Sequence, residues 1–162
     1  MRASRHTKPM KLTFTHDQLT AECIANVLNS AYITTEVEKE NEGEENETSI
    51  AKSVLDDFRF EVLAGSRDDV IFRSYVTFSK DYDEQRLRKA ADYMDFFPVD
   101  SSYCAGLENG GHVMCFHHNH VIPEDETISP AYLVKLTRYF VKALGASLRV
   151  WEAIEDVADK TV

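Results

Sequence analysis

Apolar residues change their spacing several times along the chain, and each spacing predicts a different secondary-structure element. Within residues 15–31 they recur every three or four positions, which is the period of an amphipathic helix. Thr15, followed by Gln18 three residues later, has the arrangement of an N-terminal capping box. The pattern therefore predicts a first helix over residues 15–31.

Alternating apolar and polar residues follow this helix and predict strands. Residues 32–37 are rich in β-branched and aromatic side chains, and residues 58–62 and 70–78 carry apolar side chains at most alternate positions. Residues 49–55 fit a short strand or a helical turn equally well. We therefore expect three strands here and leave residues 49–55 unassigned.

A helix and a hairpin are predicted next. Residues 82–97 have helical spacing, with Asp83 as a cap, and end before Pro98. Residues 99–107 and 112–122 read as two strands, and the Asn-Gly pair between them favours a type I′ hairpin turn.

A long amphipathic helix closes the chain. Ser129 is its predicted cap, Pro130 occupies its first position, and it runs for about 28 residues. Gly145 lies inside it at a cost of about 1 kcal/mol relative to alanine, which favours close backbone packing there. The predicted buried stripe consists of Leu133, Leu136, Phe140, Ala143, Leu144, Ser147, Trp151, Ile154 and Ala158.

This order of elements predicts the fold class. Helix, three strands, helix, two strands and helix (α-β-β-β-α-β-β-α) indicate an α+β domain with an antiparallel five-stranded sheet and three helices. The chain of 162 residues has the size of a single domain, which we place at residues 12–162. Residues 1–11 contain four basic residues and no acidic one, and we expect a flexible N-terminal tail. Met1 and Met10 are alternative starts.

Charge is distributed unevenly along the sequence. The chain has 18 Lys and Arg against 28 Asp and Glu, a net charge of −10, and residues 36–47 alone contain seven Glu and one Lys. Such a run repels itself, so we expect a mobile acidic loop over residues 38–49. The net charge also argues against binding to nucleic acid or to an anionic membrane surface.

Targeting and cysteine content indicate a cytoplasmic protein. No apolar run is long enough to cross a membrane or to form the core of a signal peptide. The three cysteines, Cys23, Cys104 and Cys115, have no disulfide-framework spacing. A two-residue hairpin turn would place Cys104 directly opposite Cys115, and we expect both to be free thiols in a reducing compartment.

The last predicted strand contains four of the six histidines. His118 and His120 point to the same face of a strand, at a spacing that two metal ligands can use. His112 shares that face at a distance, whereas His117 points the other way. Because the sequence offers no third ligand at metal spacing, we predict no metal site and keep a metal sensor or metal-dependent enzyme as the alternative.

Catalytic patterns are otherwise absent from the sequence. It has no glycine-rich phosphate loop and no nucleophile paired with a base. We therefore predict that the protein is not an enzyme and has no cofactor. The helix over residues 82–97 instead has a widened apolar surface that favours a dimer contact.

The chain resembles the YbjN-like family of bacterial proteins, whose fold is similar to that of class I type III secretion chaperones. The resemblance covers about residues 12–158 and rests on the element order, on the helix segment 87–93, on the hairpin 103–116 and on the acidic turn 123–126 before the last helix. It implies a non-enzymatic homodimer that binds a segment of a protein partner. It also implies a dimer contact near the middle helix, at Leu87, Met94, Phe96 and Phe97.

The sequence therefore favours a cytoplasmic, chaperone-like or regulatory protein-binding module that acts as a homodimer. A metal-binding protein that uses His118 and His120 is the first alternative. A structural subunit of a larger assembly is the second.

Overall fold

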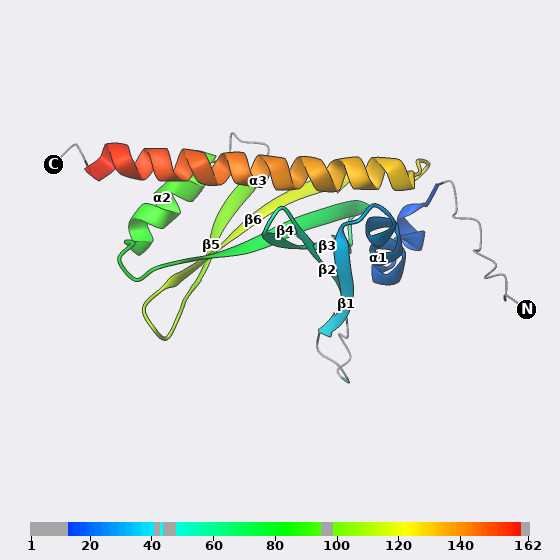
Figure 1. The fold of residues 1–162 in the computed structure, drawn as a ribbon, viewed down its shortest axis with the longest axis horizontal. Coiled ribbons are helices and arrows are strands. Elements are labelled where there is room, and N and C mark those ends of the chain that lie inside the picture. Colours follow the sequence, from blue (N-terminus) through cyan, green and yellow to red (C-terminus); the bar gives the residue numbers. More distant parts are fainter. Residues whose placement is uncertain (1–12, 41–42, 44–47, 95–98, 160–162) are drawn as a thin grey trace, which may run out of the picture.

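The computed structural model describes residues 13–40, 43, 48–94 and 99–159, with side chains described except at 93–94 and 151–159. The predicted tail over residues 1–11 lies outside these ranges. Within them the chain forms an α+β fold whose helices pack on one face of an antiparallel sheet (Figure 1).

The sheet has six strands, one more than the sequence predicts. They lie in the order β1-β2-β3-β4-β6-β5, and every neighbouring pair is antiparallel. The strands are β1 (Thr34–Glu40), β2 (Thr48–Leu55), β3 (Phe58–Ala64), β4 (Asp69–Phe78), β5 (Asp100–Gly106) and β6 (His112–Val121).

The additional strand is β2, formed by the segment that the sequence leaves unassigned. Ile50, Ala51 and Ser53 are all buried, so the segment lacks a clean period of two. Its place between β1 and β3 supplies the hydrogen-bond partners that make it a strand. The element order is therefore α-β-β-β-β-α-β-β-α, which corrects the predicted order by one strand.

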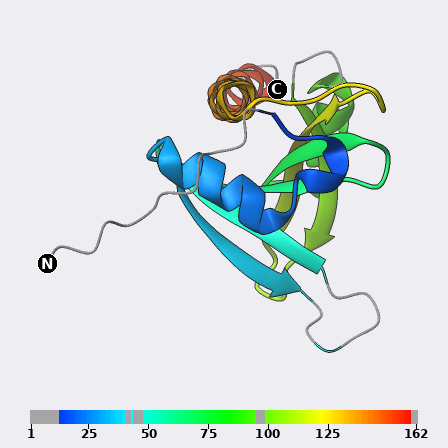
Figure 2. The same ribbon diagram turned by 90° about the vertical axis from the view of Figure 1, so that its right-hand side faces the viewer.

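Three α-helices lie on the same side of the sheet (Figures 1 and 2). These are α1 (Ala21–Ser30), α2 (Glu84–Met94) and α3 (Pro130–Asp159). The first helix begins six residues later than predicted, because Thr20 is its cap and accepts a hydrogen bond from the Cys23 amide. The Thr15–Gln18 pair belongs instead to a short 3-10 helix, η1 (His16–Gln18).

The core lies between the sheet and α3. Phe140 of α3 is fully buried, with its ring 5.9 Å from that of Phe60 and 5.7 Å from that of Phe72. These centroid distances are typical of stabilising aromatic pairs. The predicted caps of α3 are confirmed, since Pro130 is its first residue and Ser129 accepts a hydrogen bond from the Tyr132 amide.

The prediction for α3 is confirmed over most of its buried stripe. Leu133, Leu136, Phe140, Leu144 and Ser147 are buried, and Ala143 is partly buried. The side chains of Trp151, Ile154 and Ala158 lie outside the described residues.

The acidic segment is shorter as a loop than predicted. Residues 38–40 belong to β1 and residues 48–49 to β2, and residues 38–40 pair with residues 48–50 across the two strands. The predicted mobility concerns residues 41–42 and 44–47, which lie outside the described residues. The glutamates at 36, 38 and 40 alternate along β1 with Val37 and Lys39. They lie on an edge strand, where charged side chains are common.

The hairpin between β5 and β6 has a different turn from the one predicted. Of the Asn-Gly pair, Gly110 alone has a positive φ, of 84°, and the Leu107 amide donates to the Gly111 carbonyl across a longer loop. A bulge follows at Cys104, so Cys115 lies opposite Ser102. The predicted direct pairing of Cys104 with Cys115 is therefore wrong.

The geometry of a type I′ turn occurs instead between β2 and β3. Asp56 and Asp57 both have positive φ, at 50° and 67°, and Leu55 pairs with Phe58 around them. Aspartate is among the non-glycine residues that tolerate this conformation. Within the described residues, no helix is both long enough and apolar enough to cross a membrane.

Candidate functional site

One face of the sheet is covered by the helices, and the opposite face carries the candidate site. The side chains of Phe60, Val62, Phe72 and Phe116 point into the core beneath the helices. Residues at the intervening positions point to the other face, where no described helix packs (Figures 1 and 2). We call this the open face.

A single row of charged side chains crosses the open face through all six strands. The register pairs each residue of the row directly with the next, from one edge of the sheet to the other. In strand order the row consists of Glu36, Lys52, Glu61, Arg73, His117 and Asp100. Opposite charges placed directly across neighbouring strands stabilise a sheet. The pairs from Glu36 to Arg73 meet this condition, whereas Arg73 and His117 are both basic residues.

Ion pairs connect most of this charged row. Lys52 Nζ lies 2.9 Å from Glu38 Oε2 and 3.9 Å from Glu61 Oε1. Arg73 Nε donates a hydrogen bond to Glu61 Oε2. At the far end His117 Nε2 lies 3.8 Å from Asp100 Oδ2, an ion pair when the imidazole is protonated.

The middle of the row is the least exposed part. The side chain of Glu61 is 12% exposed and that of Arg73 is 25% exposed, against 37% for Lys52 and 53% for Asp100. The hydrogen bond that Lys52 donates to Glu38, together with the nearby Glu61 and Glu40 carboxylates, raises the pKa of the Lys52 ammonium. The pKa of Arg73 is also raised, so Lys52 and Arg73 both stay charged at neutral pH.

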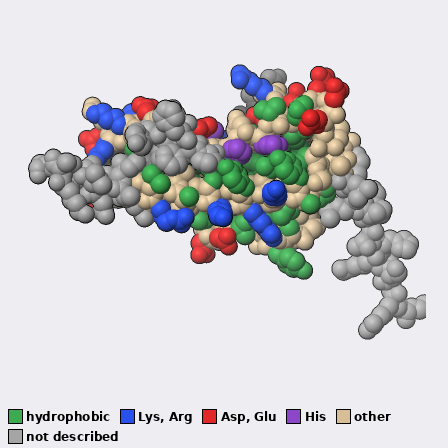
Figure 3. Space-filling model, turned by 90° about the horizontal axis from the view of Figure 1, so that it is seen from above, with side chains coloured by type: hydrophobic (Ala, Val, Ile, Leu, Met, Phe, Trp, Pro, Cys, Tyr) green, Lys and Arg blue, Asp and Glu red, His purple; other side chains and the backbone are tan. Residues whose placement is uncertain are grey.

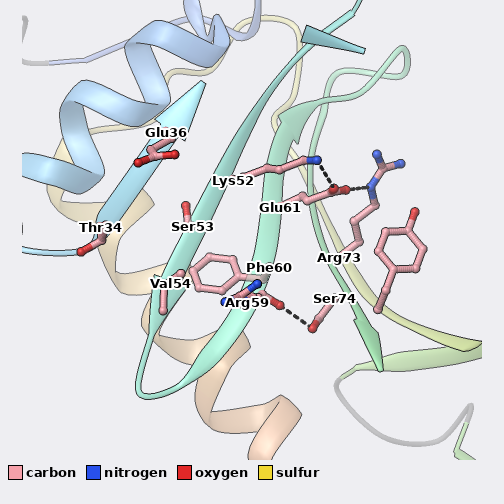
Figure 4. Close-up of a pocket in the computed structure, with 11 residues that line it drawn as sticks. Thr34, Glu36, Lys52, Ser53, Val54, Arg59, Phe60, Glu61, Arg73 and Ser74 are labelled. Carbon is pink, nitrogen blue, oxygen red and sulfur yellow. Dashed lines mark hydrogen bonds and ion pairs between the residues drawn. The ribbon is translucent and has the colours of Figure 1, made fainter. Parts of the chain in front are cut away.

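A shallow hollow of about 370 Å³ lies beside the row (Figure 4). Its charged lining comes from the row and from Arg59, and its apolar lining includes Val54 and Tyr75, which are 43% and 49% exposed. Arg73 Cζ lies 5.7 Å from the centre of the Tyr75 ring, a cation–π distance. The complete lining is Thr34, Glu36, Lys52, Ser53, Val54, Arg59, Phe60, Glu61, Arg73, Ser74 and Tyr75.

Neither serine in the hollow is placed next to a base. Ser53 Oγ lies 2.9 Å from Thr35 Oγ1, and Ser74 Oγ donates to the Arg59 carbonyl at 2.7 Å. Nucleophilic catalysis needs a hydroxyl within hydrogen-bond distance of a base, and these contacts do not supply one. The hollow offers charge, hydrogen-bond partners and apolar surface, which are the requirements of binding.

The cysteine pair lies at the other side of the open face. Cys115 is buried and Cys104 is exposed, and all three described cysteines are free thiols. Burial, with a further contribution from Cys104, raises the pKa of the Cys115 thiol to about 11. Cys115 is therefore a protonated, unreactive thiol at neutral pH.

The histidines of β6 are divided between different surroundings. His118 and His120 point toward α3, with ring centroids 6.0 Å from Tyr139 and 5.5 Å from Tyr132 respectively. His117 belongs to the charged row on the opposite face. Within the described ranges no three His, Cys, Asp or Glu side chains are grouped so as to hold a metal ion.

His112 has a structural position. Its Nε2 lies 2.9 Å from the Tyr82 carbonyl, which can only accept, so this nitrogen carries the proton. Nδ1 then accepts from the Tyr103 hydroxyl at 3.1 Å. The bond to Tyr82 connects the hairpin to the segment that leads into α2, and the bond to Tyr103 joins β6 to β5 within the hairpin.

The predicted dimer residues are described only in part. Leu87 is 1% exposed and belongs to the core of this chain, where it packs inside the monomer. The side chain of Met94, and Phe96 and Phe97 entirely, lie outside the described residues. The prediction of a contact through these three side chains stays a prediction.

The charged row was not predicted from the sequence. Each member occupies a polar position in a strand of alternating polar and apolar residues. The pattern of a single strand predicts only that such a side chain faces away from the core. Their alignment depends on the register of five strand pairs, which the pattern of any one strand does not show.

Comparison of the chain with models of protein families, with curated proteins and with solved structures gives no match.

Proposed function

We propose that this protein is a non-enzymatic binding module, chaperone-like or regulatory, that holds a segment of a partner protein on its open face. The observation that carries the proposal is the charged row beside a hollow with exposed Val54 and Tyr75. Exposed aromatic and apolar side chains next to arginine are the composition of protein-binding surfaces. The resemblance to the YbjN-like family and to secretion chaperones favours the same function.

The dimensions of the row fit an extended polypeptide. Six strands about 4.8 Å apart extend over about 24 Å, the length of about seven residues in an extended chain. From Glu36 to Arg73, a bound segment that crosses the strands would meet carboxylates and cations alternately, with an apolar side chain beside Tyr75. We therefore expect the preferred segment to contain both charge signs and an aromatic or aliphatic anchor.

A homodimer is part of the proposal, and β5 provides a surface for it. The two edges of the sheet differ, since β1 carries four charged residues whereas β5 has Asp100 alone, at its first position. Charged side chains discourage pairing at an exposed strand edge. The β5 edge is therefore the one that a second copy could extend.

Selection from a displayed library of random peptides tests binding on the open face. Peptides enriched on the wild-type protein should lose at least tenfold in affinity for the Tyr75→Ser variant, because the aromatic contact is removed. Tyr32→Ser is the matched control, since Tyr32 is 96% exposed and lies between α1 and β1. Enriched peptides that bind Tyr75→Ser as tightly as wild type would contradict the proposed site.

The dimer is tested separately by light scattering coupled to gel filtration at several concentrations. A mass near 37 kDa, twice the chain mass of 18.5 kDa, is expected. A mass of one chain at every concentration would remove the dimer from the proposal and leave the peptide-binding test unaffected.

A further inference from the structure

The exposed side of α3 between residues 130 and 150 has a charge opposite to that of the whole protein. From residue 130 to residue 150 this helix contains four basic residues and no acidic one, whereas the chain carries a net charge of −10. Their side chains are all exposed. Figure 3 looks onto the α3 side of the molecule and shows Lys and Arg side chains in a row along it. The four residues are Lys135, Arg138, Lys142 and Arg149.

These four residues form a narrow stripe. With 3.6 residues per turn, their directions around the helix axis fall within about 60° of one another. Arg138 and Arg149 are eleven positions apart, which corresponds to about 16 Å along the axis. None of the stripe residues has an ion pair with another described residue. Among the described residues, the stripe is therefore a line of positive charge without ion-pair partners.

A hollow of about 520 Å³ opens beside the stripe, between α3 and the turn that joins β2 to β3. Arg138, Lys142 and Arg149 supply its positive charge, and Phe58 is the aromatic part of its lining. The remaining lining residues are Leu55, Asp56, Val141 and Gly145. A ligand in this hollow would meet three cations and an apolar surface together.

Gly145 is the floor of this hollow, and close packing does not require it. A Cβ built at this position would lie 3.5 Å from the Phe58 ring and 3.8 Å from Arg149 Nη1, which are ordinary contacts. Glycine inside a helix is destabilising relative to alanine. The sequence therefore keeps open a space that a more stabilising residue could fill.

We propose that this hollow and the basic stripe bind an acidic segment of a partner protein, at a site separate from the open face. The distance of about 16 Å along the helix axis between Arg138 and Arg149 favours an elongated anion with several carboxylates over a single phosphate group. Leu55, Phe58 and Val141 favour a segment that also carries an apolar side chain. The same apolar lining favours a peptide over the phosphate backbone of a nucleic acid.

Asp56 lies in the same hollow and opposes an acidic ligand. Removal of the Asp56 charge should therefore tighten the binding of an acidic ligand, which provides a test of the proposal. Asn tolerates the positive φ of position 56 at least as well as Asp does, so Asp56→Asn removes the charge without disturbing the turn. This substitution should strengthen the binding of an acidic ligand several-fold.

Fluorescence anisotropy provides the measurement. The probe is a fluorescein-labelled twelve-residue peptide in which glutamates flank one phenylalanine, and its control has glutamine in place of each glutamate. At about 0.1 M salt the Debye length is about 10 Å, so repulsion from distant acidic residues is screened. We expect the glutamate peptide to bind and the glutamine peptide to bind at least tenfold more weakly.

Variants of the full chain then locate the site. Arg138→Glu and Lys142→Glu should each weaken binding of the glutamate peptide about tenfold. Lys80→Glu, at an exposed position before α2, makes the same change in net charge and should leave binding within about twofold. Circular dichroism of each variant shows that its fold is retained.

Several results would overturn this proposal. Equal losses for Arg138→Glu and Lys80→Glu would show an effect of net charge alone, and weaker binding by Asp56→Asn would place the peptide elsewhere. A single-stranded oligouridylate that binds more tightly than the peptide would indicate nucleic acid. Because Tyr75→Ser should leave this probe unaffected, failure here and failure of the open-face proposal are distinguishable.

Discussion

Glu61 and Arg73 face each other across β3 and β4, and the Arg73 guanidinium donates a hydrogen bond to the Glu61 carboxylate on the open face of the sheet. This pair is the least exposed part of a row that crosses all six strands. It holds the charges of the hollow in a fixed arrangement, since each partner restricts the rotamers of the other.

Removal of one partner of this pair should be costly. Glu61→Ala leaves a partly buried guanidinium without its carboxylate, and we expect a loss of about 1–3 kcal/mol in the free energy of unfolding. Glu38→Ala removes a 58% exposed partner of Lys52 and should cost less than about 1 kcal/mol. Urea unfolding of both variants gives the comparison, and equal losses would contradict the special position of Glu61.

His120 should make stability depend on pH. Burial, and to a smaller extent the neighbouring His118, lowers the pKa of His120 below its usual value of 6.5. The unfolded state therefore binds more protons below pH 6.5, and stability falls as the pH drops from 6.5 through the folded pKa. His120→Gln should reduce this slope in urea unfolding measured at several pH values, whereas an unchanged slope would assign it to other groups.

The two cysteines of the hairpin should react at different rates. Cys104 is exposed, whereas Cys115 is buried and has a pKa of about 11, so its thiolate is scarce at neutral pH. Mass spectrometry after a short treatment with iodoacetamide at pH 7.5 should find Cys104 alkylated well before Cys115. Equal labelling would show that the hairpin opens on the timescale of the reaction.

Phe140 should dominate the docking of α3. Its ring contacts Phe60 and Phe72 and has no exposed surface, so Phe140→Ala should cost about 3–5 kcal/mol. Tyr139 is 46% exposed, and Tyr139→Ala should cost much less. Chemical denaturation measures both losses, and a loss for Phe140→Ala no larger than that for Tyr139→Ala would contradict the packing.

Gly145→Ala should stabilise the protein by about 1 kcal/mol. Alanine is the better helix former, and the added Cβ has room beside Phe58. Gly110→Ala is the opposite case, because its φ of 84° is strained for any residue with a Cβ. Thermal unfolding should show a higher midpoint for the first variant and a lower one for the second.

The candidate sites illustrate why prediction from the sequence was incomplete. The histidines of β6 drew attention because they are adjacent in the chain, yet the structure divides them between two faces and packs His118 and His120 against tyrosines of α3. The charged row was not predicted, because its members are scattered along the sequence from Glu36 to His117. Chemical sites depend on proximity in space, which a list of neighbours in sequence represents poorly.

The sequence by itself determined the helices, most strands and the α+β class, because amphipathic period and capping residues act over a few neighbouring positions. It also determined the cap of α3 at Ser129 and Pro130. The tertiary structure alone decided that residues 48–55 are a strand, that Cys115 faces Ser102, and that six ionisable side chains align across the sheet. These features depend on strand register, a long-range property that local patterns leave undetermined.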